Sequence, residues 1–148
     1  MRLLITGGTG LIGSNLMPKL KPNEITVVTR NVSQAELVLG HKVTLISSLD
    51  DFENLDDFHV VINLAGEPIA DKRWSPEQKK RIEHSRWDMT EKLVSLIKAG
   101  SAPPSLFISG SAIGYYGRQN EQIIDEEFDA PHDEFSHQLC ARWEFLAK

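Results

Sequence analysis

Five short runs of apolar and β-branched residues recur along the chain, each followed by a polar or helix-forming segment. The first run, residues 3–5, is continuously apolar, which is typical of a strand buried on both faces of a sheet. From these runs we expect strands at residues 3–5, 24–29, 42–46, 60–64 and 106–109.

Between the runs, apolar residues recur at a helical spacing of three to four. We expect helices at residues 11–20, 33–39, 75–99 and 134–148, and a loop or short exposed helix at 50–57. Pro18 should kink the first helix because it removes one intrahelical donor. Strands and helices alternate, so the pattern predicts an α/β fold. We expect one Rossmann-type domain over residues 1–148, with a doubly wound parallel sheet and helices on both faces.

The helix that begins after Ser75 has the clearest signals. Ser75 can cap its N-terminus, Pro76 suits the first turn, and Gln78 completes a capping box. Gly100 should end it. One stripe at three-to-four spacing carries Ile82, Arg86, Met89, Leu93 and Leu96 or Ile97.

A glycine-rich turn lies between the first strand and the first helix. Gly7, Gly10 and Gly13 form the pattern GxxGxxG. Glycine permits a sharp strand-to-helix turn and leaves backbone N–H groups open to a pyrophosphate. The position of the pattern favours a dinucleotide site, and the alternative is an ordinary strand-to-helix turn. The expected cofactor residues here are Gly7, Thr9, Gly10, Leu11, Ile12 and Gly13.

Composition narrows the classes of partner. The net charge of −5 offers no basic patch for nucleic acid, and no apolar run is long enough for a membrane span. The N-terminus enters the fold directly, without the pattern of a secretory signal. Cys140 is the only cysteine, so a reducing, cytoplasmic setting is expected. No metal site is expected, because metal-ligand spacing is lacking among His41, His59, His84, His132 and His137.

Three segments in order carry a resemblance to a known family. They are the glycine turn, Asn63-Leu64-Ala65-Gly66, and Ser109-Gly110-Ser111-Ala112. Together they resemble an extended short-chain dehydrogenase/reductase. Residues 63–74 and 109–117 more narrowly resemble its atypical subgroup of epimerase-family, nucleoside-diphosphate-sugar epimerase-like proteins. The resemblance covers the whole chain and implies a cofactor-binding part, because family members continue into a substrate-binding region.

The residue 20 positions after Gly10 predicts the choice of cofactor. An acidic residue at this distance would bind the ribose 2′-hydroxyl of NAD(H). Arg30 stands there instead, directly after Thr29. A cation and a hydroxyl can hold a 2′-phosphate, so we expect NADP(H). The alternative is that Arg30 is a solvated loop residue.

Further cofactor contacts follow from topology and from the resemblance. The backbone of Leu64, Ala65 and Gly66 is expected along the adenosine and its ribose, or in a tight turn without a ligand. Arg86 replaces an asparagine of the relatives, and either contacts the cofactor or forms a structural ion pair. Ser109, at the end of the fifth strand, is also assigned to the cofactor. The segment 72–74 either closes over the cofactor or is a charged loop with one packed tryptophan.

The resemblance supplies only part of a catalytic site. Ser111 matches the hydroxyl that polarises a substrate carbonyl in the relatives, and its alternative is a turn serine. Tyr115 is a candidate acid, although tyrosines in such loops often pack. The relatives' Tyr and the Lys four residues later are missing, because the two alignments give Phe135 with Leu139, or Ser136 with Cys140. Cys140 is expected to be a buried helical thiol.

Two functions from different classes therefore remain. The first is an NADP(H)-dependent oxidoreductase or epimerase-like enzyme that acts on an unidentified small molecule with Ser111 and Tyr115. The second is a module that binds NADP(H) without turnover and senses or regulates. A small-molecule substrate is the expected partner, and a homodimer is left open.

Overall fold

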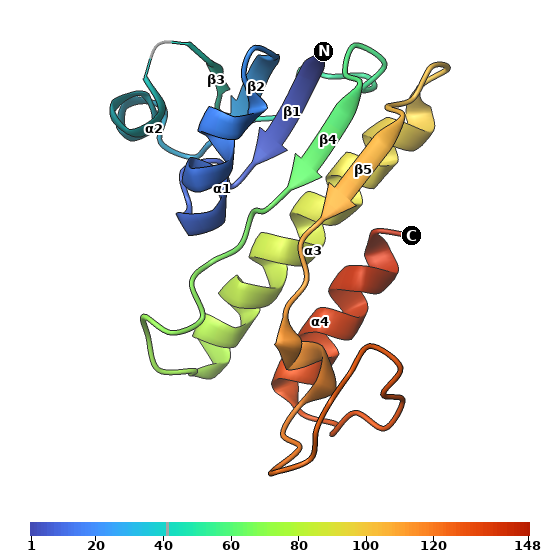
Figure 1. Cartoon of the computed structure of the whole chain (residues 1–148). Helices are drawn as coiled ribbons and strands as arrows, with labels where there is room; N and C mark the ends of the chain where they lie inside the picture. Colours follow the sequence, from blue (N-terminus) through green and yellow to red (C-terminus); the bar gives the residue numbers. More distant parts are fainter. Residues whose placement is uncertain (41) are drawn as a thin grey trace.

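The computed structural model describes residues 1–40 and 42–148 and shows a five-stranded, all-parallel sheet (Figure 1). The strand order is β3-β2-β1-β4-β5, so the chain runs outward from β1 in one direction and then returns to the other side. The strands are β1 (Arg2–Thr6), β2 (Glu24–Val28), β3 (Thr44–Ile46), β4 (Val60–Asn63) and β5 (Leu106–Ser109). The predicted Rossmann-type α/β fold is confirmed.

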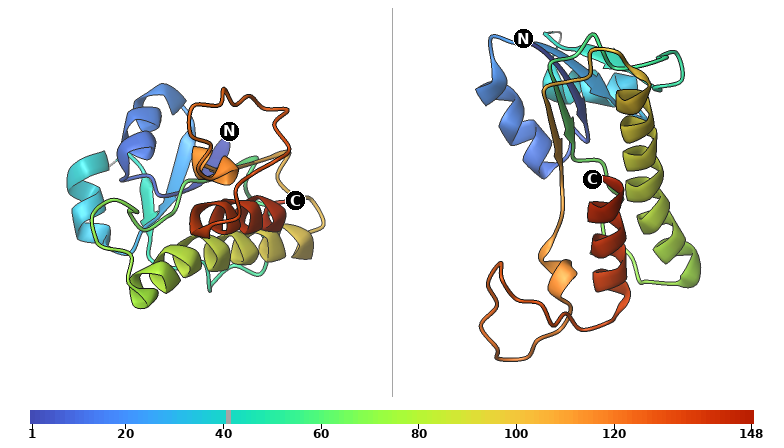
Figure 2. Two further views of the ribbon diagram at one scale, coloured as in Figure 1. Left: turned by 90° about the horizontal axis from the view of Figure 1, so that it is seen from below. Right: turned by 90° about the vertical axis from the view of Figure 1, so that its right-hand side faces the viewer.

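Helices cover both faces of the sheet (Figure 2). α1 lies on one face, and α3 lies on the other with α4 alongside it. The elements outside the sheet are α1 (Leu11–Leu16), η1 (Met17–Leu20), α2 (Val32–Leu39), α3 (Pro76–Ala99), η2 (Ile113–Tyr116) and α4 (Phe135–Leu146).

Two hydrophobic cores follow from this layering. On the α1 face, Met17 packs with Ile5 and Val27. On the α3 face, Leu93 packs with Leu4 and Val61. Neighbouring residues of β1 therefore point to opposite sides, as expected of a strand buried on both faces.

The first helix ends earlier than predicted. The α-helix stops at Leu16 and continues as the short 3₁₀ turn η1. Pro18 explains the change, because it has no N–H to donate to the carbonyl four residues earlier. The other predicted helices and strands are confirmed to within two residues of their ends.

The acidic segment 50–57 forms turns rather than a helix, and it is not simply exposed. Leu55 is fully buried, and Phe58 just beyond the segment joins it in the core of the α3 face. The side chain of Asp56 accepts a hydrogen bond from the backbone N–H of Ser101 at 2.9 Å. This loop therefore packs into the core of the α3 face and binds the segment that follows the C-terminal end of α3.

Candidate cofactor site

The glycine turn joins β1 to α1 along a path that excludes side chains at its tightest points. Gly7 has a φ of +70°, and a Cβ there would lie 2.3 Å from the carbonyl oxygen of Leu64. A Cβ on Gly13 would lie 2.4 Å from the carbonyl oxygen of Gly7. The N–H of Gly10 closes the turn by donating to that same oxygen at 3.1 Å. The residues present therefore fit a phosphate-bearing ligand, which needs this close approach to the backbone.

A cleft of about 460 Å³ opens beside this turn, at the carboxyl ends of the parallel strands. Ligands bind at this edge in open α/β sheets. Eight of the predicted cofactor residues line the cleft: Gly7, Thr9, Gly10, Thr29, Arg30, Leu64, Ala65 and Gly66. The opposite wall comes mainly from α3, with His84, Ser85, Asp88 and Met89.

The remaining predicted cofactor residues do not line this cleft. Gly13 is buried within the turn, while Leu11 and Ile12 are exposed in the first turn of α1. Ser109 is half-buried at the end of β5 and pairs in register with Asn63 of β4. Contacts of these residues with a cofactor stay predictions.

Arg86 lies behind the cleft wall rather than in the cleft. Its guanidinium donates to the carbonyl oxygens of Glu67 and Ile82, each at 3.1 Å, and stacks over the ring of Trp143 at 5.3 Å. A Cβ on Gly66 would lie 2.9 Å from this guanidinium. Burial lowers the pKa of Arg86. The guanidinium thus binds the loop after β4 through the backbone carbonyl of Glu67 rather than through the ion pair expected as the alternative, and direct cofactor contact stays a prediction.

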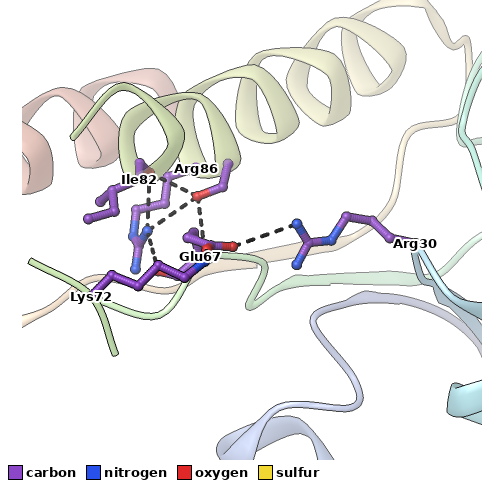
Figure 3. A network of polar contacts seen from close by, with 6 residues as sticks. Arg30, Glu67, Lys72, Ile82 and Arg86 are labelled. Carbon is purple, nitrogen blue, oxygen red and sulfur yellow. Dashed lines mark hydrogen bonds and ion pairs between the residues drawn. The ribbon is translucent and has the colours of Figure 1, made fainter. Parts of the chain in front are cut away.

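Glu67 is a cleft residue that is absent from the predicted set. It extends the strand-end loop from Gly66, and its carboxylate lies between two cations (Figure 3). Oε2 is 3.7 Å from Nη1 of Arg30, and Oε1 is 3.5 Å from Nζ of Lys72. The available signal was its position in the loop after β4, because the loops at the carboxyl ends of parallel strands border the ligand cleft.

The surroundings of Glu67 keep its carboxylate charged. Burial raises its pKa, but a polar contact with Gln78 and the charges of Lys72 and Arg30 outweigh that effect. The pKa therefore lies below its usual value. The Glu67 backbone is also fixed, because its N–H donates to the Ser85 hydroxyl at 2.8 Å.

A buried chain of hydrogen bonds supports the cleft from inside the fold. The Thr6 hydroxyl donates to Asn63 at 2.6 Å and accepts from the N–H of Ala65 at 3.2 Å. The Asn63 amide in turn donates to the Thr90 hydroxyl at 2.9 Å. Trp143 of α4 donates to the same hydroxyl at 3.0 Å. These hydrogen bonds link the ends of β1 and β4 to α3 and α4, the two helices of one face of the sheet.

The predicted catalytic residues, Ser111 and Tyr115, lie outside the lining of the cleft and contact opposite ends of α4. The Ser111 hydroxyl donates to the carboxylate of Glu144 on α4. Tyr115 lies in η2, where its ring packs edge-on against Tyr116 and His137 with centroids 5.5 Å apart. Both residues follow β5, and the end of this strand is held to β4 by the N–H of Gly110, which donates to the carbonyl of Asn63 at 2.8 Å.

The first turns of α4 give Phe135 and Ser136, the two positions that the alignments left open, different neighbours. A Cβ on Gly114 would lie 3.2 Å from the Cβ of Ser136 and 3.4 Å from the Sγ of Cys140, so this pair faces η2. Phe135 instead packs against Trp74, with ring centroids 5.1 Å apart. Cys140 is buried, as expected, and burial raises the pKa of its thiol.

The comparisons with known proteins agree with this geometry. A family model described as "NAD dependent epimerase/dehydratase family" matches residues 3–144. The chain belongs to the NAD-dependent epimerase/dehydratase family. It is 36% identical over 155 residues to the Arabidopsis thaliana "Epimerase family protein SDR39U1 homolog, chloroplastic", covering 99% of this chain and 44% of that protein. It is 34% identical over 151 residues to the Staphylococcus haemolyticus "Epimerase family protein SH2119", covering 99% and 49%.

Solved structures of epimerase-family proteins share the fold. The human epimerase family protein SDR39U1 (isoform 2), crystallised with NADPH, matches with a TM-score of 0.77 and 27% identity, over 100% of this chain and 49% of that chain. UDP-glucuronic acid 4-epimerase from Bacillus cereus, in complex with UDP-glucuronic acid and NAD, matches with a TM-score of 0.78 and 20% identity, over 99% and 51%. The chain therefore spans about half the length of these epimerase-family relatives.

Neither a membrane-spanning helix nor a metal site is found in the part of the chain that the structure describes. Within residues 1–40 and 42–148, no helix has both the length and the apolar character of a membrane span. Over the same ranges, no group of three or more His, Cys, Asp or Glu side chains could hold a metal ion. His41, one of the histidines considered in the sequence, lies outside the described residues.

Proposed function

We propose that this chain is the NADP(H)-binding domain of an oxidoreductase or epimerase-like enzyme that acts on an unidentified small molecule. The observation that carries the proposal is the placement of Thr29 and Arg30. Both line the cleft at the end of β2, next to Thr9 and Gly10 of the glycine turn. A guanidinium in this position can pair with a 2′-phosphate while the turn holds the pyrophosphate.

The cofactor supplies hydride chemistry when it is bound, and the chain supplies the binding surface. Gly7, Thr9 and Gly10 of the glycine turn line the cleft together with Leu64, Ala65 and Gly66, which follow β4. The crystallisation of human SDR39U1 with NADPH also supports NADP(H), whereas the Bacillus cereus epimerase was crystallised with NAD. Titration of the purified full-length protein with NADPH and with NADH tests the choice, and tighter binding of NADPH is expected.

The catalytic part of the proposal rests on Ser111. Its hydroxyl lies just beyond the end of β5, and its contact with Glu144 fixes its orientation. Tyr115, the second assigned residue, is half-buried against His137 and would serve as the acid. Consumption of NADPH, followed by absorbance against a panel of carbonyl compounds and sugar nucleotides, tests this role. Ser111→Ala should abolish any turnover that is found.

A non-catalytic NADP(H)-sensing or regulatory module is the second candidate. The observation that favours it is the pair facing η2, because Ser136 and Cys140 supply neither a phenol nor an ammonium. Tight binding of NADPH without consumption across the whole panel would support the module. We further propose a cytoplasmic location, on the ground that Cys140 is the only cysteine of the sequence and is buried.

A further inference from the structure

The cleft contains an ion pair between the segments that follow two of the strands, β2 and β4. Arg30 comes from the end of β2 and Glu67 from the loop after β4, and their closest charged atoms are 3.7 Å apart (Figure 3). The side chains of the two partners differ in their exposure to solvent. The side chain of Arg30 is 87% exposed, whereas that of Glu67 is 16% exposed.

Glu67 is the fixed partner because its neighbours hold it on several sides. Ser85 and Arg86 of α3 bind its backbone, and Lys72 occupies Oε1 of its carboxylate. The other oxygen, Oε2, is directed at Arg30. The exposed arginine therefore rests against an anchored anion inside the cleft.

We propose that Glu67 is a specificity-determining residue that competes with the 2′-phosphate of the cofactor for Arg30. This inference rests on the proposed function, in which Arg30 binds that phosphate. A dianionic phosphate must draw the guanidinium away from Glu67 before it can pair with it. An unphosphorylated ribose has no such competition. Glu67 thus limits the preference for NADP(H) over NAD(H), and the strength of the pair sets the limit.

The direction of the effect follows from charge alone. An exposed ion pair contributes little, so its loss should change affinity modestly. Removing the Glu67 charge should tighten binding of NADPH and of 2′,5′-ADP by about two- to five-fold, with little change for NADH and 5′-AMP. The change should vanish when Arg30 is absent, because the competition acts through that side chain.

The test is isothermal titration calorimetry of the full-length protein with these four ligands. The variants are Glu67→Gln, Arg30→Ala and the double variant. Asp71→Asn is the matched control, because it removes one negative charge from an exposed position in the same loop. Glu67→Gln and Glu67→Ala both leave the backbone contacts of Glu67 in place, so either can serve if the other folds poorly.

The outcomes separate the inference from the function on which it rests. Tighter binding of the 2′-phosphorylated ligands in Glu67→Gln, absent in Asp71→Asn and in the double variant, would support the competition. Unchanged or weaker binding in Glu67→Gln, with a normal loss in Arg30→Ala, would overturn the inference and leave the NADP(H) site standing. If Arg30→Ala itself changes nothing, the proposed function fails and the inference fails with it.

Discussion

The indole of Trp143 donates its Nε1–H to the hydroxyl of Thr90 at 3.0 Å, between α4 and α3. Thr90 is completely buried, and it also accepts from Asn63 at 2.9 Å and donates to the carbonyl of Arg86 at 2.7 Å. One hydroxyl thus joins three elements directly behind the cofactor cleft. Its three bonds use the full capacity of a threonine side chain.

Replacement of Thr90 should therefore lower the free energy of unfolding by more than the loss of one small side-chain group would suggest. Thr90→Val keeps the shape but leaves the buried donors of Asn63 and Trp143 without an acceptor, and we expect a loss of about 2–4 kcal/mol in the free energy of unfolding. Thr90→Ser retains the hydroxyl and should lose less. Urea denaturation followed by circular dichroism measures both variants. A Thr90→Val protein as stable as the wild type would show that the buried chain contributes nothing.

Gly7→Ala should abolish cofactor binding and destabilise the fold. The new Cβ would meet the backbone of Leu64 at 2.3 Å, and the φ of +70° disfavours any side chain. Gly40→Ala is a matched control, because Gly40 has a φ of +72° with no atom within 4 Å of the added Cβ. The control should lose about 1–3 kcal/mol of stability through backbone strain alone and retain NADPH affinity. Equal loss of affinity in the two variants would argue against a binding role of the turn.

The polar contact of Glu67 with Gln78 and its ion pairs should make stability depend on pH. Its pKa is lower in the folded protein than in the unfolded chain, so its stabilising contribution is complete above the ordinary glutamate pKa of 4.5. That contribution is lost as the pH falls from there through the lower folded pKa. Glu67→Gln should therefore flatten the stability profile below pH 4.5 and leave its slope near neutrality unchanged. Denaturation midpoints across this range provide the measurement, and parallel profiles would contradict the assignment.

Much of the fold could be predicted because its signals are local. The run at residues 3–5, the glycine turn and the cap at Ser75 each depend on neighbours in sequence, and each is confirmed. Ser75 indeed accepts a hydrogen bond from the N–H of Gln78 at 3.2 Å. The predicted end of the first helix was wrong, because η1 retains helical spacing while its hydrogen bonding changes after Leu16.

Residues of the cofactor cleft could be predicted only where the order of parallel strands determines their position. Parallel strands must end together, so the cleft residues of β1, β2 and β4 could be anticipated. Glu67 and Thr90 act through partners from distant segments, and no local pattern reports such pairs. The orientation of α4 likewise depends on tertiary contacts, because only its packing against η2 shows that Ser136 and Cys140 face that element.

The NADP(H) assignment is tested best by the ratio of the dissociation constants for NADH and NADPH, measured in the full-length wild type and in Arg30→Ala. Charge-assisted hydrogen bonds to a phosphate should give the wild type a clear preference for NADPH. Arg30→Ala should weaken NADPH binding by about ten- to a hundred-fold and leave NADH binding within about two-fold. Equal affinity of the wild type for both cofactors, unchanged by Arg30→Ala, would contradict the assignment of an NADP(H) site with Arg30 at the 2′-phosphate.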